Sequence, residues 1–527
     1  MGHPVTKLSR PLVWGCAILI LATACTRPAG GWIAPTPAGI SDGNGQGGGN
    51  INAAGPTGGM PTTSPSPTPT APNAWTGTPT PNPTPIGYVL GTGVESYVVQ
   101  PGQTLGWIAL VFGCTVEEIV AANNLADANS ITAGQTLIIP VSATEVGPSL
   151  KLVPDSEMVY GPAYISFDLP GFIAAQGGYL ASYTEEVEGN VLKGAEIVQL
   201  VSQRFSVGPR VLLALLELRS RWVTDPQPAP ETLSYPLGYV KEYHEGLFRQ
   251  LSWAASSLNE GYYGWKWRRR GTLRLGDGTR VAIAPVLNPG SAGVQNCLAG
   301  LSASLEEWQT LVGSSGFPAV YERLFGNPFA YAVEPLVPPD LVQPELCLPW
   351  ETGQTWYFTG GPHGGWGNDN DRAALDFVPA EKHSGCAPSS SWATAAASGL
   401  VVRSEHGELV LDLDGDGFEQ SGWVLCYLHL YEEGRVAAGT FVQRGQRLGR
   451  PSCEGGYATA THLHFARRYN GEWIPAGEGN APMTLSGWVA HSDVMPYEGT
   501  MTRDDEVRTA CECWEDEVNG LLSECAP

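Results

Sequence analysis

The sequence predicts a multidomain protein with a small α+β module, a mainly helical middle domain and a carboxy-terminal domain built on an antiparallel β-sheet. Three observations favour this division. The chain has 527 residues, more than the roughly 100 to 200 that one domain usually holds. Gly, Pro, Thr and Ser dominate before residue 93, whereas ordinary apolar content follows. After residue 346 helical periodicity gives way to short, glycine-rich alternating strands.

Composition narrows the class of partner. Aliphatic and aromatic residues make up 43% of the chain, which is enough to bury several cores, and the formal net charge is −23. A strongly negative protein is not captured electrostatically by phosphate backbones or anionic lipid headgroups. We therefore expect no nucleic-acid partner.

The amino terminus predicts export. Lys7 and Arg10 precede an apolar run at 12–21, and Ala22-Thr23-Ala24-Cys25 follows, which is the three-part layout of an export signal. Small residues before a cysteine resemble a bacterial lipobox, which implies cleavage before Cys25 and lipidation of its thiol. We expect 1–25 to be a lipoprotein-type signal peptide and the mature protein to be anchored at the outer face of the cell membrane, in the cell envelope. An ordinary secretory signal or an uncleaved anchor helix is the alternative.

The segment 26–93 is expected to be a disordered linker. It consists mainly of Pro, Thr, Gly, Ser and Ala. Such a composition buries too little apolar area to offset the entropy lost on ordering. It would tether the folded domains to the membrane.

Residues 94–141 form a compact unit with the order strand, helix, helix, strand. Thr104 is suited to cap the first helix, Thr115 and Glu118 form a capping box for the second, and 134–140 closes with a strand. This order resembles a LysM domain, with the resemblance carried by Pro101-Gly102-Gln103-Thr104-Leu105, Asn123-Asn124 and Gly134-Gln135. The resemblance implies binding of peptidoglycan glycan; a purely structural small domain is the alternative.

The region 150–345 predicts a mainly helical domain of unknown role, with helical periodicity at 195–205 and 209–218. Its segment 212–222 weakly resembles the catalytic helix of lysozyme-like transglycosylases. That family places a glutamate directly before the serine, whereas this chain has Arg219, which is no general acid, and Glu217 faces another side of the helix. We expect a catalytically silent domain rather than an active glycosidase.

Histidines concentrate in the region 346–500. His462-Leu463-His464 alternates as a strand does, so both imidazoles project to one face. Tyr427-Leu428-His429 predicts a second strand, with its phenol and imidazole also on one side. If these two strands pair, three imidazoles meet.

A catalytic zinc site needs three protein ligands and leaves a fourth position for water. His363 and Asp376 are the further candidates in this region. A surface position for either residue is the alternative, but Asp376 sits in an apolar strand, where an unpaired charge is costly and a metal would compensate it.

Several segments of this region carry a more specific resemblance. Leu348-Pro349-Trp350, Gly353 and Trp356 precede the first histidine, Cys453-Glu454-Gly455-Gly456 precedes His462-Leu463-His464-Phe465, and Tyr469-Asn470-Gly471 follows. These segments resemble the lysostaphin-type metallopeptidases, especially the staphylolysin (LasA) and beta-lytic branch. Most of that family has its first histidine four residues before the aspartate, where this chain has Arg372. The staphylolysin branch uses a longer loop, and 376 − 363 = 13 suits it.

The resemblance implies roles for five residues. His363, Asp376 and His464 would bind one zinc ion, while His429 and His462 would be catalytic beside the bound water. One of the two would accept the proton of that water and the other would stabilise the oxyanion. The sequence does not decide between them. Tyr427 would assist orientation or simply pack in its strand.

Two further features have an open interpretation. Asp412, Asp414 and Asp416 match the start of a calcium loop, but Trp423 stands where its last glutamate ligand is expected, so an aspartate-rich hairpin turn is preferred to calcium. The acidic tail 501–527 is expected to be a disulfide-tied or disordered end. Nine cysteines follow Cys25, an odd number, so at least one stays unpaired.

By resemblance, then, the expected protein is a zinc metalloendopeptidase that hydrolyses peptide cross-links of bacterial peptidoglycan and is held on glycan by its LysM module. A non-catalytic wall-binding regulator or activator of other wall hydrolases is the main alternative. A general extracellular protease, an enzyme that lyses other bacteria and a wall-binding scaffold are further ones.

Overall fold

The computed structural model describes residues 93–525, except 100–102, 113, 115, 129, 142–144, 268, 368–369, 382–384 and 494. The expected signal peptide, Cys25 and most of the expected linker therefore lie outside the described residues, as does His383. In the described part of the chain, no helix is both long and apolar enough to cross a membrane.

The first described unit has the expected element order. It contains β1 (Gly93–Val98), α1 (Leu105–Phe112), α2 (Val116–Asn123) and β2 (Thr136–Val141), with β1 and β2 antiparallel. The side chain of Thr104 accepts a hydrogen bond from the Trp107 N–H at 3.2 Å, which caps α1. The strands and helices enclose a small core of their own that includes Ile108, Ile119 and Leu137.

The middle region is mainly helical, as expected. Its main elements are α3 (Asp155–Met158), α4 (Leu169–Gln176), β4 (Thr184–Val187), β5 (Asn190–Lys193), α5 (Gly194–Phe205), α6 (Pro209–Ser220), α7 (Leu247–Lys266), α8 (Pro289–Gly300), α9 (Leu305–Val312) and α10 (Phe317–Phe325). A small sheet joins β3 (Glu145–Val146), β7 (Arg280–Ala282) and β6 (Thr272–Arg274). Consecutive leucines of α6 are fully buried, so this helix lies at the centre of the domain.

Glu217, the residue nearest to a catalytic acid in α6, is buried in a polar network. Its carboxylate accepts hydrogen bonds from the Thr224 hydroxyl at 2.7 Å and from Arg323 at 2.8 Å. Arg219 donates to the Leu237 carbonyl. These contacts tie both side chains to neighbouring helices and loops.

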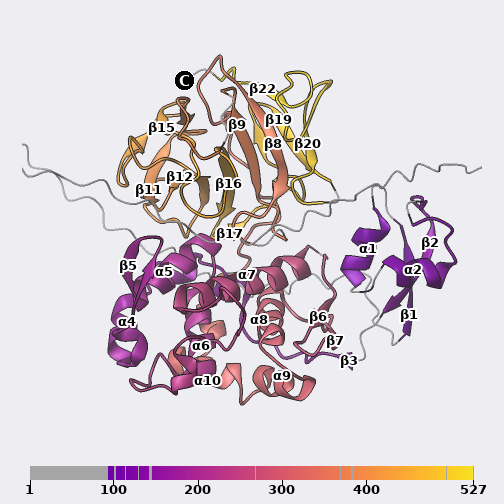
Figure 1. The fold of residues 1–527 in the computed structure, drawn as a ribbon, viewed down its shortest axis with the longest axis vertical. Coiled ribbons are helices and arrows are strands. Elements are labelled where there is room, and N and C mark those ends of the chain that lie inside the picture. Colours follow the sequence, from indigo (N-terminus) through magenta and orange to yellow (C-terminus); the bar gives the residue numbers. More distant parts are fainter. Residues whose placement is uncertain are drawn as a thin grey trace, which may run out of the picture. The chain divides into compact units, whose positions relative to one another are not determined.

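The carboxy-terminal region is built on a large antiparallel sheet (Figure 1). Its strand order is β14 (Phe441–Val442), β11 (Gly399–Glu405), β12 (Glu408–Asp412), β13 (Trp423–Leu428), β16 (Leu463–Tyr469), β9 (Ala374–Pro379), β8 (Thr355–His363) and β22 (Gly520–Leu522), with β17 (Glu472–Trp473) beside β16. A second sheet contains β18 (Thr484–Leu485), β19 (Trp488–Ser492), β20 (Gly499–Arg503) and β21 (Glu506–Thr509), and β10 (Ala393–Thr394) pairs with β15 (Arg447–Gly449).

The two faces of the large sheet are buried in different cores. One face supplies Leu411, Leu425 and Phe465 to the core of the carboxy-terminal region itself. On the other face Cys426 and Ala466, which are cross-strand partners, belong to the core of the helical domain. The helical domain therefore packs directly on one face of this sheet.

The expected boundary at residue 500 is wrong. It falls inside β20, and β22 extends the large sheet at the edge formed by β8. A disulfide joins Cys347 to Cys525. The last strand and this covalent link make residues 501–525 part of the carboxy-terminal domain. Without β22, the edge of β8 would expose unpaired backbone groups.

Six of the nine cysteines after Cys25 are bridged. Besides Cys347–Cys525, the pairs are Cys386–Cys453 and Cys511–Cys513. The three other cysteines are buried thiols, namely Cys114, Cys297 and Cys426.

Candidate metal centre and active site

Three neighbouring strands of the large sheet bring His363, Asp376 and His464 together. His464 of β16 lies directly opposite Asp376 of β9, and His363 ends β8 on the other side of β9. The His363 Nε2 and His464 Nδ1 atoms are 3.0 Å apart. Asp376 Oδ1 is 3.1 Å from His464 Nδ1 and 3.3 Å from His363 Nε2.

The far nitrogen of each of these rings faces a backbone carbonyl. His363 Nδ1 lies 2.8 Å from the Gly361 carbonyl oxygen and His464 Nε2 lies 3.1 Å from that of Gly365. Since a carbonyl only accepts, these nitrogens carry the hydrogens, and the nitrogens that face each other bear lone pairs. Two imidazole lone pairs and a carboxylate oxygen repel one another unless a cation lies among them.

The donor set fits zinc. Bonds of about 2.0 to 2.1 Å in a tetrahedron place ligand atoms roughly 3.3 Å apart, close to the separations of the three atoms. Gly360, opposite Asp376, provides the room, because a Cβ there would lie 2.7 Å from Asp376 Oδ2. Burial would raise the pKa of Asp376, but a positive charge on His363 or His462 lowers it well below its usual range, so the side chain stays a carboxylate.

His429 and His462 lie beside this triad. Their ring centroids are 4.5 Å apart, and His462 Nε2 is 3.7 Å from Asp376 Oδ1. Each Nδ1 faces a backbone carbonyl, that of Glu454 at 2.9 Å and that of Ala460 at 2.8 Å, so each Nδ1 carries a hydrogen and each neutral ring would have its lone pair on Nε2. Burial, with the other imidazoles, lowers the pKa of His429 well below its usual value, which keeps it neutral and able to accept a proton.

Tyr427 is not beside these histidines, contrary to our expectation. It lies opposite Phe465 in the paired strands and is fully buried in the core on the other face of the sheet. Its hydroxyl accepts a hydrogen bond from the Ala396 N–H at 2.8 Å. His429 follows the end of β13 with a left-handed φ of 66°, so strand alternation does not extend from Tyr427 to His429.

One aromatic residue at the site was missed by the sequence analysis. The ring of Tyr497 stacks on His363, with centroids 4.1 Å apart and planes 17° from parallel. Backbone hydrogen bonds with Gly361 and Pro362 hold it there. Tyr497 lies outside the strands, between β19 and β20, where no periodic pattern marks it.

The three aspartates of the possible calcium loop form a turn after β12. Oxygens of Asp412, Asp414 and Asp416 lie within 4.8 Å of one another. Asp412 accepts hydrogen bonds from the N–H groups of Asp414, Gly415 and Gly417. Burial, together with the neighbouring Asp414, raises the pKa of Asp412 to about 7. These contacts are those of an aspartate-rich turn, the interpretation that the sequence favoured over calcium.

Known proteins resemble this chain in separate regions. The family model described as LasA, N-terminal domain, matches residues 151–338, and the LysM domain model matches residues 97–140. Protease LasA of Pseudomonas aeruginosa strain UCBPP-PA14 is 27% identical over 354 residues, which cover 62% of this chain and 76% of the relative. The N-acetylmuramoyl-L-alanine amidase XlyA of Bacillus subtilis strain 168 is 38% identical over 76 residues, 14% of this chain and 26% of the relative.

Two solved structures are also similar. The M23 metalloprotease pseudoalterin, from the deep sea, is 24% identical with a TM-score of 0.27, covering 32% of this chain and 96% of its own. The catalytic domain of lysostaphin from Staphylococcus simulans is 25% identical with a TM-score of 0.16, covering 22% and 81%. By its sequence matches, the chain is similar to LasA-type peptidases and carries a LysM domain.

Proposed function

We propose that this protein is a zinc-dependent endopeptidase that hydrolyses peptide cross-links of bacterial peptidoglycan. The observation that carries the proposal is the convergence of three lone-pair atoms, from His363, Asp376 and His464, at 3.0 to 3.3 Å from one another. Similarity to Protease LasA supports the reaction class. The LysM match supports peptidoglycan as the substrate.

The roles of the residues follow from their protonation. His363, Asp376 and His464 would hold the ion. Bound zinc polarises a scissile carbonyl and lowers the pKa of water to about 7. Of His429 and His462, one would take the proton of the attacking water at its bare Nε2. The other, once protonated, would stabilise the oxyanion and donate a proton to the leaving amine.

The LysM module and the amino-terminal segment would position the enzyme in the cell envelope. The LysM module would hold the enzyme on glycan, and lipidation of Cys25 would anchor it at the outer face of the cell membrane. The proposed lipid anchor rests on the sequence, because Cys25 lies outside the described residues.

Wild-type and His464→Ala proteins, both full length, distinguish the proposal from its main alternative. Bound zinc is measured, and new amino termini are counted after incubation with purified peptidoglycan. The proposal expects about one zinc per chain and released stem peptides in the wild type, with both lost in His464→Ala. A non-catalytic regulator would bind the same peptidoglycan and release nothing, in which case the enzymatic proposal fails. Casein, incubated in parallel, tests for a general protease.

A further inference from the structure

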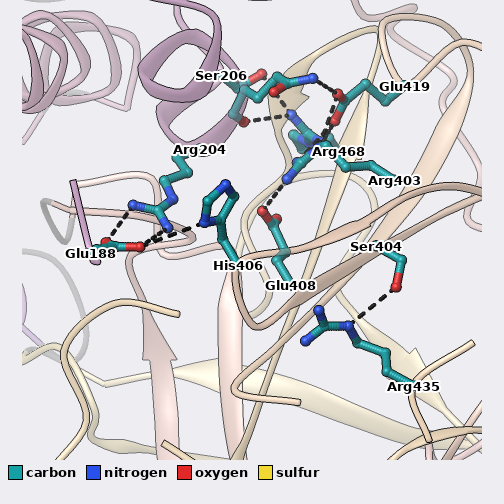
Figure 2. A network of polar contacts seen from close by, with 11 residues as sticks. Glu188, Arg204, Ser206, Arg403, Ser404, His406, Glu408, Glu419, Arg435 and Arg468 are labelled. Atoms are coloured by element: carbon teal, nitrogen blue, oxygen red, sulfur yellow. Dashed lines mark hydrogen bonds and ion pairs between the residues drawn. The ribbon is translucent and has the colours of Figure 1, made fainter. Parts of the chain in front are cut away.

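The segment 435–450 of the carboxy-terminal domain contains four arginines, and three of them have their charge paired. Each of the three faces a glutamate, in the pairs Arg435–Glu454 at 3.7 Å, Arg444–Glu345 at 3.5 Å and Arg447–Glu351 at 2.7 Å. Arg435 also donates a hydrogen bond to the Ser404 hydroxyl at 3.2 Å (Figure 2). Among the described residues, Arg450 has no ion-pair partner, and its buried Nε has no hydrogen-bond partner. The charge of Arg450 is therefore available to a ligand.

Two aromatic rings hold the Arg450 side chain. Its guanidinium carbon lies 5.2 Å from the ring centroid of Tyr431 and 5.9 Å from that of Trp392. The Trp392 ring is itself fixed, because Arg447 lies 5.2 Å from its centroid and a Cβ at Gly434 would lie 3.3 Å from it. An aromatic ring attracts a guanidinium through its π face, which leaves the in-plane N–H groups for another partner. Since Arg450 and both rings are partly exposed, that partner can come from solution.

The backbone connects Arg450 to the two proposed catalytic histidines. The Arg450 carbonyl accepts a hydrogen bond from the Tyr431 N–H at 2.8 Å. Two residues along, the His429 carbonyl accepts from the N–H of Ser452 at 2.6 Å and from its hydroxyl at 3.1 Å, and Ser452 also forms a β-bridge with His462. Because an extended chain rises about 3.3 Å per residue, Arg450 lies about 7 Å along the chain from the residue that pairs with both histidines.

We infer that Arg450, held between Trp392 and Tyr431, binds a carboxylate of the peptide substrate, about two or three residues from the bond that is cut. The in-plane N–H groups of a guanidinium match a planar carboxylate, which accepts two parallel hydrogen bonds. A net charge of −23 disfavours long phosphate polymers, which are attracted over a distance by the charge of the whole protein. The inference rests on the proposed function for the identity of the ligand, but binding is measurable without catalysis.

The test compares full-length wild type with Arg450→Gln. Arg444→Gln is the matched control, because Arg444 lies in the same segment and pairs with an exposed glutamate. A synthetic stem peptide without sugar, and without the cross-link that would be cut, is titrated calorimetrically, and so is the same peptide with every carboxylate converted to carboxamide. Glycerol 3-phosphate is titrated as the competing kind of anion. Hydrolysis kinetics are measured on the cross-linked peptide.

Wild type is expected to bind the carboxylate peptide about tenfold more tightly than the carboxamide peptide, since a charge-assisted pair is lost in the latter. Arg444→Gln should keep this preference, whereas Arg450→Gln should bind both peptides within about twofold of each other. On the cross-linked peptide, Arg450→Gln should raise KM by about tenfold with kcat nearly unchanged, as loss of uniform binding does. Arg450→Lys, which keeps the charge without the planar fork, should show part of the preference and covers the case in which Arg450→Gln fails to fold.

Equal affinity of wild type for the two peptides, or a preference that survives in Arg450→Gln, overturns the inference. Tighter binding of glycerol 3-phosphate than of the carboxylate peptide also overturns it, because the site would then be one for phosphate. If wild type hydrolyses no cross-linked peptide while the carboxylate preference is present and disappears in Arg450→Gln, the proposed function fails and the carboxylate site stands.

Discussion

At the scale of residues, the metal proposal depends on charge as well as geometry. Replacing Asp376 by Asn keeps the shape but removes the anion from a site already holding two neutral imidazoles. Because a carboxylate is a much stronger zinc ligand than an amide, Asp376→Asn is expected to retain less than about a tenth of the bound zinc. Metal analysis of the dialysed protein measures this.

Asp277→Asn is the matched control for that substitution. Asp277 lies in an exposed turn and accepts a hydrogen bond from Thr279, so its variant should keep the wild-type zinc content. Equal zinc in Asp376→Asn and the control would contradict the assignment of the ligand.

Tyr427 provides a second residue-scale prediction. Tyr427→Phe leaves the buried Ala396 N–H without its acceptor, which costs about 1 to 3 kcal/mol of the free energy of unfolding. Because the phenol lies on the opposite face from the histidines, kcat should stay within about twofold of the wild-type value. Urea unfolding and hydrolysis kinetics check the two statements. A large loss of kcat with unchanged stability would restore the catalytic role that the sequence suggested.

What the sequence could predict about the site follows from periodicity. His464 lies in β16 and His462 directly precedes that strand, so the alternation of side chains predicts that both imidazoles lie on one side. The apolar neighbours of Asp376 indicate a buried charge. His429 and Tyr427 are also two residues apart, but the strand ends between them and a left-handed residue turns the imidazole. Tyr497 comes from a loop, where side-chain direction depends on tertiary contacts that no local pattern records.

At the scale of elements, helices were easier to predict than sheet edges. The periodicity at 195–205 and 209–218 agrees with α5 and α6 to within two residues, because each helix buries most of its length and Pro209 starts the second. The three-residue strand β22 has no such pattern. It pairs with β8, more than 150 residues earlier in the chain, a contact set by tertiary packing and by the Cys347–Cys525 disulfide.

This disulfide should stabilise the carboxy-terminal domain considerably. It closes a loop with a sequence separation of 178 residues, and constraining so long a loop in the unfolded chain contributes about 2 to 5 kcal/mol. The double variant Cys347→Ala/Cys525→Ala should lose that amount in urea unfolding followed by near-ultraviolet circular dichroism. Cys511→Ala/Cys513→Ala, which opens a bridge with a separation of only 2, is the control and should lose much less. Similar losses in both would show that the long loop is not the cause.

At the scale of the whole molecule, a buried ion-pair cluster joins the helical domain to the large sheet. The Glu419 carboxylate pairs with Arg403 at 3.1 Å and Arg468 at 2.8 Å, and it accepts from the Gln203 side chain of α5 at 2.9 Å. Arg468 in turn donates to the Gln203 carbonyl. Loss of the Glu419 charge would leave two buried guanidinium groups at the interface without enough negative charge.

This cluster makes the interface between the helical domain and the large sheet acid-sensitive. Burial would raise the pKa of Glu419, but Arg403 and Arg468 outweigh it and lower the pKa from 4.5 to about 2. A depressed carboxylate pKa stabilises the fold above the unfolded-state pKa, and this stability is lost as the pH falls through the folded-state value. The contribution, about 3 kcal/mol, should therefore be complete above about pH 5 and vanish between about pH 4.5 and 2.

Glu419→Gln should lower the free energy of unfolding at neutral pH, and its difference from wild type should shrink as the pH falls through that window, as measured by urea unfolding at a series of pH values. Glu506→Gln, at an exposed glutamate of β21, is the control and should follow the wild-type curve. Parallel curves for wild type and Glu419→Gln down to pH 2 would mean that Glu419 is not the group that makes the interface acid-sensitive.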